Sequence, residues 1–383
     1  MRMTIKKQLV IALLLVGITP FVIMGVTSYI KSSNALNTEA ISKMEMARDL
    51  KKEQLGGYFG MLKNSMENMA ENRQIHLLYD DLVTLHKKHD VGANEPFAII
   101  NEPETKSVYA KFDGYFGKYM KKNDLYDVFL ICAKHGHVMY SVTKESDLGQ
   151  NLATGELRNS KLHEAWKTAI DDKEAHMTDI APYAPSNGEP AMFMAVPIIE
   201  NGVVEGVIAA QINPEAINKI MQSRTGMGES GETYLVGQDK LMRSDSFLDP
   251  KNHSLIASFK NPSTGSVNSD ASNAALSGKS DIKIVIDYNG NPVLSAYTPF
   301  EFLDLRWALL AEIDEVEVFA SVISLRNNAI IMGGIFLAII IGIALFLGRF
   351  ISNPIIRSVE SITSANSQVV SAAGEISESS QAL

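Results

Sequence analysis

The sequence predicts an α+β protein in which a long helix leads into two tandem antiparallel-sheet modules, with a membrane-spanning helix on either side. Three observations lead to this prediction. Two hydrophobic runs bracket nearly three hundred residues of ordinary globular sequence, Leu9 to Ile30 and Ala329 to Leu347. An apolar stripe with helical spacing follows the first run, and strand-and-turn patterns then occur twice, about a hundred residues apart.

Each hydrophobic run is long enough to cross a bilayer as a helix. Residues 9–30 contain no charged side chain and follow three basic residues, so the positive-inside rule places residues 1–8 in the cytoplasm. A cleaved signal peptide is the alternative, but the run is long for a signal and lacks a clear cleavage site before Tyr29. Residues 329–348 form the predicted second transmembrane helix, and the region between the helices is expected outside the cytoplasm.

The predicted outer region is acidic. Residues 31–327 contain 30 Lys and Arg against 41 Asp and Glu, a net charge of −11, so nucleic acid is not an expected partner. The single cysteine, Cys132, lies in an apolar run and is expected to be a buried thiol rather than a nucleophile. Because no disulfide can form within the chain, packing must stabilise the outer region.

A long helix is predicted after the first membrane segment, within a mainly helical stalk at residues 31–115. Apolar residues recur there at alternating steps of four and three, at Leu55, Phe59, Leu62, Met66 and Met69. This spacing indicates a packing face, which also suits a dimer seam.

The pattern changes to strands from about Leu125. Tyr126–Ala133 and His137–Val142 form a predicted hairpin, and a second joins Met192–Ile199 to Val203–Ile212 through a Glu-Asn-Gly turn. The first turn contains His135, but a metal site needs further ligands that the neighbouring sequence does not offer, so no metal is expected.

The strand pattern then repeats. Two further predicted hairpins pair Thr233–Val236 with Leu241–Ser244 and Ile282–Asp287 with Pro292–Tyr297. The repeat divides the sheet region into a first module, residues 116–215, and a second module, residues 216–325.

This layout resembles the double Cache sensor of bacterial methyl-accepting chemotaxis proteins. The resemblance covers residues 31–325 and is most specific in Asp179–Pro197 and Gly226–Ser246. It implies two PAS-like modules, the first membrane-distal and the second membrane-proximal, in a homodimer. It also implies a multi-pass protein of the bacterial cytoplasmic membrane, whose sensor is periplasmic or extracellular.

The resemblance also implies a small-molecule ligand in the first module, between the sheet and its covering loops. Arg158 is a candidate partner for a carboxylate, Trp166 and Tyr183 for an apolar body, and Asp179 for an amine. Each also has a structural interpretation, as a solvated charge, a core residue or a turn residue. The predicted ligand-binding set is Tyr126, Phe129, Arg158, Ser160, Trp166, Asp179, Tyr183 and Phe193.

The ligand class stays open among amino acids, amines and carboxylates. The amino-acid-binding subset of the family carries an Arg and an aromatic pair close together on one helix. Here seven residues separate Arg158 from Trp166, and Lys167 follows the Trp where a second aromatic residue is expected.

A heptad follows the second membrane segment and predicts a cytoplasmic coiled coil within residues 349–383. Ser364–Leu383 resembles the start of the chemoreceptor signalling helix, and Asn353–Ile355 resembles the beginning of a HAMP linker, which is either abbreviated or absent. The heptad reaches the last residue without a cap, so a fragment is expected, with methylation sites beyond Leu383. Its positions are Ile355, Val359, Ile362, Asn366, Val369, Ala373, Ile376, Ser380 and Leu383.

No catalytic residues and no cofactor are expected. The sequence has no H-E-x-x-H and no nucleophile elbow, and its G-x-G-x-x-G at Gly226–Gly231 precedes a strand instead of following one. The expected function is a transmembrane chemoreceptor that controls a chemotaxis histidine kinase through a coupling protein. The alternative is a membrane histidine kinase or nucleotide cyclase whose catalytic part is missing. A Ser-, Ala- and Gln-rich heptad without histidine favours the chemoreceptor.

Overall fold

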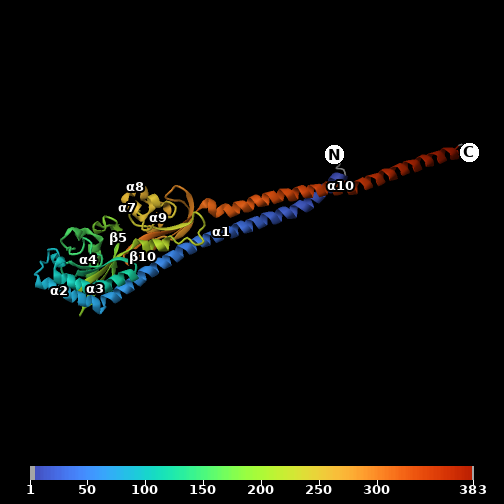
Figure 1. The fold of residues 1–383 in the computed structure, drawn as a ribbon. Helices are drawn as coiled ribbons and strands as arrows, with labels where there is room; N and C mark the ends of the chain where they lie inside the picture. The colour runs from blue at the N-terminus through green and yellow to red at the C-terminus, as the bar shows by residue number, and fades with distance from the viewer. Residues whose placement is uncertain (1–4, 382–383) are drawn as a thin grey trace. The chain divides into compact units, whose positions relative to one another are not determined.

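The computed structural model describes residues 5–381, which form two compact units (Figure 1). Ala40–Val318 form one unit, here called the sensor unit, and the flanking residues form a helical unit. Helix α1 (Ile5–Ala70) and helix α10 (Glu315–Gln381) each belong partly to both units. The mixture of a long N-terminal helix, antiparallel sheets and a long C-terminal helix confirms the predicted α+β class.

The helical unit contains the two apolar stretches. Both α1 and α10 contain a segment long and apolar enough to cross a membrane. Within this unit the rings of Phe21 and Phe336 lie 5.0 Å apart. Helix α10 is unbroken at Pro354, where the HAMP-like segment was predicted. Of the predicted heptad, Leu383 lies outside the described residues, and the side chain of Ser380 is not described.

The first module is an antiparallel sheet in the order β2-β1-β7-β6-β3. Its strands are β1 (Leu125–Cys132), β2 (Val138–Ser141), β3 (His176–Met177), β6 (Phe193–Glu200) and β7 (Val203–Ile212). Both predicted hairpins are confirmed to within about two residues at each end. The remaining elements are α2 (Arg73–Lys88), α3 (Pro103–Lys122), α4 (Lys161–Asp172) and the short pair β4 (Ala181–Pro182) and β5 (Pro190–Ala191), with 3-10 turns at Ala98–Asn101, Glu156–Asn159 and Ala184–Ser186.

The two faces of this sheet pack into different apolar clusters. Leu130 and Met139 join the cluster that contains the buried residues of α1, α2 and α3. Phe129 and Val138, one residue away along the same strands, join Trp166 of α4 in the other cluster. This alternation is the period of two that a buried strand imposes.

The second module repeats the plan with four strands in the order β8-β11-β10-β9. They are β8 (Glu232–Val236), β9 (Asp281–Ile286), β10 (Pro292–Phe302) and β11 (Leu305–Asp314). Figure 1 shows α7, α8 and α9 beside this sheet, and α2, α3 and α4 around the first. The helices of the second module are α5 (Pro214–Met221), α6 (Pro250–His253), α7 (Leu255–Lys260), α8 (Pro262–Gly265) and α9 (Asp270–Leu276).

One predicted strand is wrong. Leu241–Ser244 forms only a single bridge, between Val236 and Met242, and no ladder. Two backbone hydrogen bonds form this bridge, from the Gly237 amide to the Leu241 carbonyl and from the Arg243 amide to the Leu235 carbonyl. The pairing goes no further because the Leu235 amide donates to Ser244 Oγ instead of to a backbone carbonyl. Gly226–Gly231 is a loop ahead of β8, as predicted.

The apolar stripe of α1 packs inside the chain. Its members are buried in the same cluster as the α2 side of the first sheet. Phe59 also meets the second module, where its ring lies 5.5 Å from Phe302, 5.9 Å from Phe300 and 6.1 Å from Trp307. The predicted packing face is therefore confirmed, and because its side chains fill the chain's own core they are not left exposed for a dimer seam.

Candidate ligand-binding site

Polar side chains enter the α4 side of the first sheet at one end of its apolar cluster. Asp127 on β1 lies directly opposite Gln211 on β7, and Gln211 lies opposite Phe193 on β6. Cross-strand partners share a face, and so do alternate residues along a strand. Asp127 and Gln211 therefore project on the side that carries Phe129, and both are buried.

Asp127 holds the chain that follows β2. Its Oδ1 accepts hydrogen bonds from the amides of Val142 (2.9 Å) and Thr143 (3.1 Å). Its Oδ2 accepts from the hydroxyls of Ser141 and Thr143, each at 2.6 Å. Burial raises the pKa of Asp127, although these hydrogen bonds oppose the rise. The carboxylate is thus fully used in fixing the loop that begins at Val142.

Asp147, in that loop, is buried but only half satisfied. The Tyr183 hydroxyl donates to its Oδ2 at 3.0 Å, while its Oδ1 has no hydrogen-bond partner. Burial, and then the charge of Asp127, raise the pKa of Asp147 to about 7. The pKa of Tyr183 is also raised, by burial and then by the charge of Asp147. A buried acceptor with a free lone pair is the kind of group that a bound donor can satisfy.

Gln211 offers a second unsatisfied acceptor. Its Nε2 donates to Ser186 Oγ at 3.1 Å, while its Oε1 has no partner. Ser186 in turn donates to Glu145 Oε2 at 3.4 Å, and the Tyr126 hydroxyl donates to Glu145 Oε1 at 2.7 Å. We call the group formed by Asp127, Glu145, Asp147, Tyr183, Ser186 and Gln211 the acidic cluster.

The acidic cluster contains three carboxyl groups and no cation. Among the ion pairs of residues 5–381, none involves Asp127, Glu145 or Asp147. The adjacent Lys144 pairs with Asp113 instead, at 2.5 Å. Negative charge in the cluster is therefore uncompensated by the protein.

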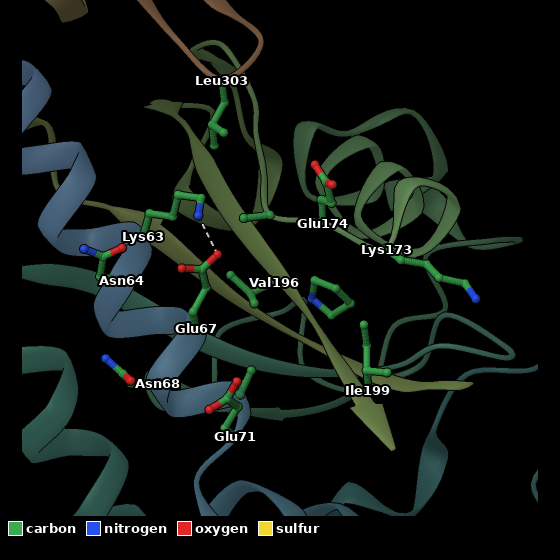
Figure 2. A pocket seen from close by; sticks show the side chains of 13 residues that line it. Lys63, Asn64, Glu67, Asn68, Glu71, Lys173, Glu174, Val196, Ile199 and Leu303 are labelled. Atoms are coloured by element: carbon green, nitrogen blue, oxygen red, sulfur yellow. Dashed lines mark hydrogen bonds and ion pairs between the residues drawn. The ribbon is translucent and has the colours of Figure 1, made fainter. Parts of the chain in front are cut away.

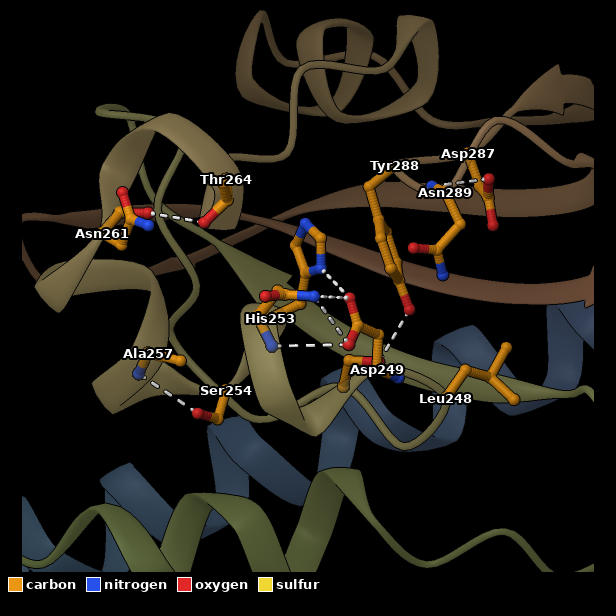
Figure 3. Close-up of polar contacts among 12 residues, drawn as sticks. Leu248, Asp249, His253, Ser254, Ala257, Asn261, Thr264, Asp287, Tyr288 and Asn289 are labelled. Carbon is orange, nitrogen blue, oxygen red and sulfur yellow. Dashed lines mark hydrogen bonds and ion pairs between the residues drawn. The ribbon is translucent and has the colours of Figure 1, made fainter.

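The second module carries the equivalent polar group. Glu232 Oε2 accepts from the Ser246 hydroxyl (2.9 Å) and from the amides of Phe247 (2.9 Å) and Leu248 (3.2 Å), as Asp127 accepts from Ser141, Val142 and Thr143. Glu312 lies opposite Glu232, as Gln211 lies opposite Asp127. Figure 3 shows the loops of this region, where Asp249 bonds to His253 at 2.8 Å and the His253 ring lies 4.3 Å from that of Tyr288.

The two modules differ in how completely these groups are satisfied. In the second module, Glu312 accepts from the hydroxyls of Tyr234 and Ser295, each at 2.6 Å. Within the described chain, the buried side-chain atoms that lack a partner include Asp147 Oδ1 and Gln211 Oε1 but no atom of residues 216–318. The second module satisfies its polar group with its own donors, whereas in the first module two buried acceptors, Asp147 Oδ1 and Gln211 Oε1, have no donor.

Five of the eight predicted residues lie at the acidic cluster or in the apolar cluster beside it, and Tyr126 among them is 38% exposed, next to a shift in the β1–β7 register. Tyr126 and Tyr183 donate to the acidic cluster. The Phe193 ring lies 4.9 Å from that of Tyr183 and 6.2 Å from that of Phe129. Trp166 packs in the same apolar cluster and donates its indole N–H to the Cys132 carbonyl at 3.1 Å.

The other three predicted residues are placed differently. Arg158 is exposed in the turn before α4. Ser160 caps α4, since its Oγ accepts from the His163 amide at 3.2 Å. Both oxygens of Asp179 accept hydrogen bonds from Arg243 of the second module, each at 2.7 Å.

Sequence reasoning missed the acids of the cluster and Gln211. The available signal was a polar residue inside an otherwise apolar strand, at Asp127 in β1 and Gln211 in β7. Glu145 and Asp147 lie in a loop and have no such signal. Their position follows only from the packing of Tyr126 and Tyr183 against that loop.

A groove of about 820 Å³ lies between α1 and the first sheet (Figure 2). Figure 2 shows Lys63 of α1 directed at Glu67, with which it forms an ion pair of 2.5 Å. Lys173, Glu174 and Ile199 line the other wall. No residue of this lining has an unpartnered buried side-chain atom among the described residues, so the acidic cluster is the better candidate.

Comparison with known proteins identifies the family of the sheet-containing region. The family model described as Cache domain matches residues 32–322. Similar solved structures include the ligand-binding domain of the Pseudomonas fluorescens chemoreceptor CtaA in complex with L-serine (17% identity, 74% of this chain and 98% of that chain covered, TM-score 0.43). Others are those of Campylobacter jejuni Tlp3 in complex with 4-methylisoleucine (12%, 74% and 94%, 0.46) and Pseudomonas aeruginosa PctB in complex with L-Gln (14%, 74% and 93%, 0.41). Because the family model covers well over half of its residues, the chain belongs to the Cache domain family.

Proposed function

We propose that this chain is the sensor and membrane portion of a transmembrane chemoreceptor whose first module binds a small molecule through a protonated amine. The observation that carries the proposal is the pair of unpartnered buried acceptors, Asp147 Oδ1 and Gln211 Oε1, in a cluster without a cation. A buried acceptor left without a donor costs about 1–3 kcal/mol, which a bound donor offsets.

An ammonium group suits this cluster better than the other ligand groups considered. It supplies three N–H donors and one positive charge, and so matches two free acceptors beside uncompensated carboxylates. A ligand with only carboxylate groups would meet like charge at Glu145 and Asp147. Amines and amino acids are therefore favoured over simple organic acids.

Signalling from this site is part of the same proposal. Two apolar helices flank the Cache domain, which supports a multi-pass protein whose sensor lies outside the cytoplasmic membrane. The heptad side chains Ile355, Val359 and Ile362 are exposed in the single chain, which supports a coiled coil formed by a homodimer. Ligand binding would alter this coil only if it stabilises one signalling state more than the other. The proposed partners are a chemotaxis histidine kinase and its coupling protein.

A ligand screen on the full chain in detergent tests the binding proposal. Thermal unfolding is followed with amino acids, primary amines and organic acids at millimolar concentration, because a ligand of the folded state raises the unfolding temperature. We expect a rise with a compound that carries a protonated amine, and loss of that rise in Asp147→Asn. The matched control is Glu312→Gln, which neutralises a buried acid of the second module and should keep the ligand response.

Two kinds of result would contradict this proposal or favour its alternative. Stabilisation by organic acids alone, or by an amine equally in Asp147→Asn and in the unaltered chain, would overturn the assignment of the acidic cluster. The alternative function is that of a membrane histidine kinase or nucleotide cyclase, which would use the same kind of sensor domain. It is favoured only if the full-length protein shows kinase or cyclase activity of its own.

A further inference from the structure

Three histidines converge on the other side of the first sheet. His86 comes from α2, and His135 and His137 come from the turn between β1 and β2. One ring nitrogen from each lies within 4.8 Å of the other two. The three rings lie 5.0 to 5.5 Å apart between centroids. They border the α2-side core, where Phe97 contacts both His86 and His137, and so are separate from the acidic cluster.

The hydrogen bonds fix which nitrogen of His137 is free. A backbone carbonyl can only accept, so Nε2 of His137 carries the hydrogen that it donates to the Glu95 carbonyl at 2.8 Å. The lone pair of its Nδ1 then faces His86 Nε2, which lies 3.2 Å away. A carbonyl that holds the second ring nitrogen in this way is the usual outer partner of a metal-ligating histidine.

The ring of His135 lies 5.5 Å from each of the other two rings between centroids. Its Nδ1 is buried and has no hydrogen-bond partner. Two nitrogens bound to one tetrahedral metal at about 2.0–2.1 Å lie about 3.3 Å apart. The separation of His86 and His137 already matches this spacing, and the turn residue His135 needs a movement of order 1 Å to complete it.

We propose that His86, His135 and His137 bind a divalent transition metal of the zinc, nickel or copper class through three imidazole nitrogens. Imidazole suits these metals, whereas magnesium and calcium prefer oxygen ligands. His86 and His135 border a cavity of about 730 Å³ that is also lined by Cys132 and Glu205, so a fourth position is open to water or to another ligand.

A metal here would join two elements that are distant in the sequence. α2 supplies one ligand and the β1–β2 hairpin supplies two. Without metal, the same rings satisfy one another only in part, through the single contact between His86 and His137. Binding would therefore stabilise the packing of α2 on the first sheet, independently of any ligand at the acidic cluster.

The test is a titration of the full chain, produced without a histidine tag and freed of metal with a chelator. Zn²⁺ binding is measured by calorimetry, and Co²⁺ serves as a spectroscopic probe of four-coordinate geometry. We expect one equivalent of metal per chain and no heat with Mg²⁺. His86→Gln and His135→Gln, in partly exposed residues that leave the core intact, should each weaken Zn²⁺ binding at least tenfold, since even losing an outer partner costs about 10–100-fold.

A matched control and two contrary outcomes complete the experiment. His76→Gln changes another histidine of α2 that lies outside the group and should leave Zn²⁺ affinity unchanged. If the unaltered chain binds no Zn²⁺ at micromolar concentration, the three rings are a packed cluster only. If His86→Gln and His135→Gln both bind as tightly as His76→Gln, the metal lies elsewhere. Either result overturns the proposal without affecting the amine site.

Discussion

Asp179 and Arg243 form a paired contact between the two modules of the sensor unit. Arg243 Nε and Nη2 each donate to Asp179 at 2.7 Å, and the Trp307 indole donates to the same carboxylate at 2.8 Å. The Arg243 side chain is only 2% exposed. Burial alone would raise the pKa of Asp179, but the hydrogen bonds and charge of Arg243 outweigh it and hold the pKa below its usual value. This carboxylate therefore serves the junction of the modules.

Asp179→Asn should destabilise the sensor unit by about 3 kcal/mol. Removing one partner of a buried ion pair leaves the other charge uncompensated, which costs about 3–5 kcal/mol. The lower figure applies here because Asp239 stays 3.0 Å from Arg243. Denaturant unfolding followed by the fluorescence of Trp166 and Trp307 measures the loss.

The control for this variant is Asp171→Asn. Asp171 pairs with Lys167 on the exposed face of α4, where an ion pair contributes less than about 1 kcal/mol. If Asp179→Asn keeps full stability and loses ligand binding, then Asp179 contacts the ligand, as the sequence analysis expected.

Stability should fall as pH rises from about 5 to 7 and then level off. The pKa values of Asp147 and Glu312 are raised to about 7, against about 4 in an unfolded chain, so between these values the folded state binds more protons. Folding is then favoured at the acidic end. Each group contributes at most about 4 kcal/mol, which is lost progressively between about pH 4 and pH 7, with little further change at higher pH. Unfolding temperatures from pH 5 to 8 test this.

Variants identify the groups responsible for that slope. Asp147→Asn should raise the unfolding temperature at pH 8 and flatten part of the slope, and Glu312→Gln should do the same for the second module. The slope should be unchanged in Asp171→Asn. A stability that is constant from pH 5 to 8 in the unaltered chain would contradict the raised pKa values.

Amine binding should weaken below pH 7. A proton and the ammonium group compete for Asp147, whose pKa in the free protein is about 7. Each pH unit below that value should weaken binding by up to about tenfold, because the ligand must displace one proton from Asp147. Dissociation constants measured from pH 5.5 to 8 check the slope. An affinity that does not change with pH would show that the ligand does not replace this proton.

Local patterns were sufficient to predict most of the fold. The hairpins β1–β2 and β6–β7 follow from alternating apolar residues and turn residues, which act over a few positions. The predicted strand at Leu241–Ser244 is reduced to one bridge because the Ser244 hydroxyl accepts from the Leu235 amide, which would otherwise continue the backbone pairing. Propensity alone does not contain such contacts.

The candidate site was predictable only in part. The aromatic residues Tyr126, Phe129, Tyr183 and Phe193 lie at or beside the acidic cluster, and their contact with ligand stays a prediction. Asp147 was not found because its burial depends on tertiary packing over a polar loop. The histidine group was missed for a similar reason, since His86 lies far upstream of His135 and only the docking of α2 brings them together.

Phe59→Ala should destabilise the sensor unit by about 3–5 kcal/mol. Its ring is fully buried between α1 and three aromatic rings of the second module, so truncation leaves a cavity as well as removing apolar contact. Met61→Ala, two residues along the same helix, is the control, because Met61 is 70% exposed and should change stability by less than about 0.5 kcal/mol. Equal effects of the two variants would contradict the packing of α1 against the second module.

Val359→Asp combined with Ile362→Asp should abolish output while leaving ligand affinity unchanged. Both side chains are exposed in the single chain, at 54% and 69%, on the stripe expected to meet a second copy. Charges at these positions oppose association of the two helices, whereas the acidic cluster lies in the separate sensor unit. Cross-linking within membranes measures association, and titration of the detergent-solubilised chain measures affinity. Val370→Asp is the control, because Val370 is equally exposed but lies off the heptad. Loss of ligand binding in the double variant would contradict a modular receptor, and retained association would contradict the coiled-coil seam.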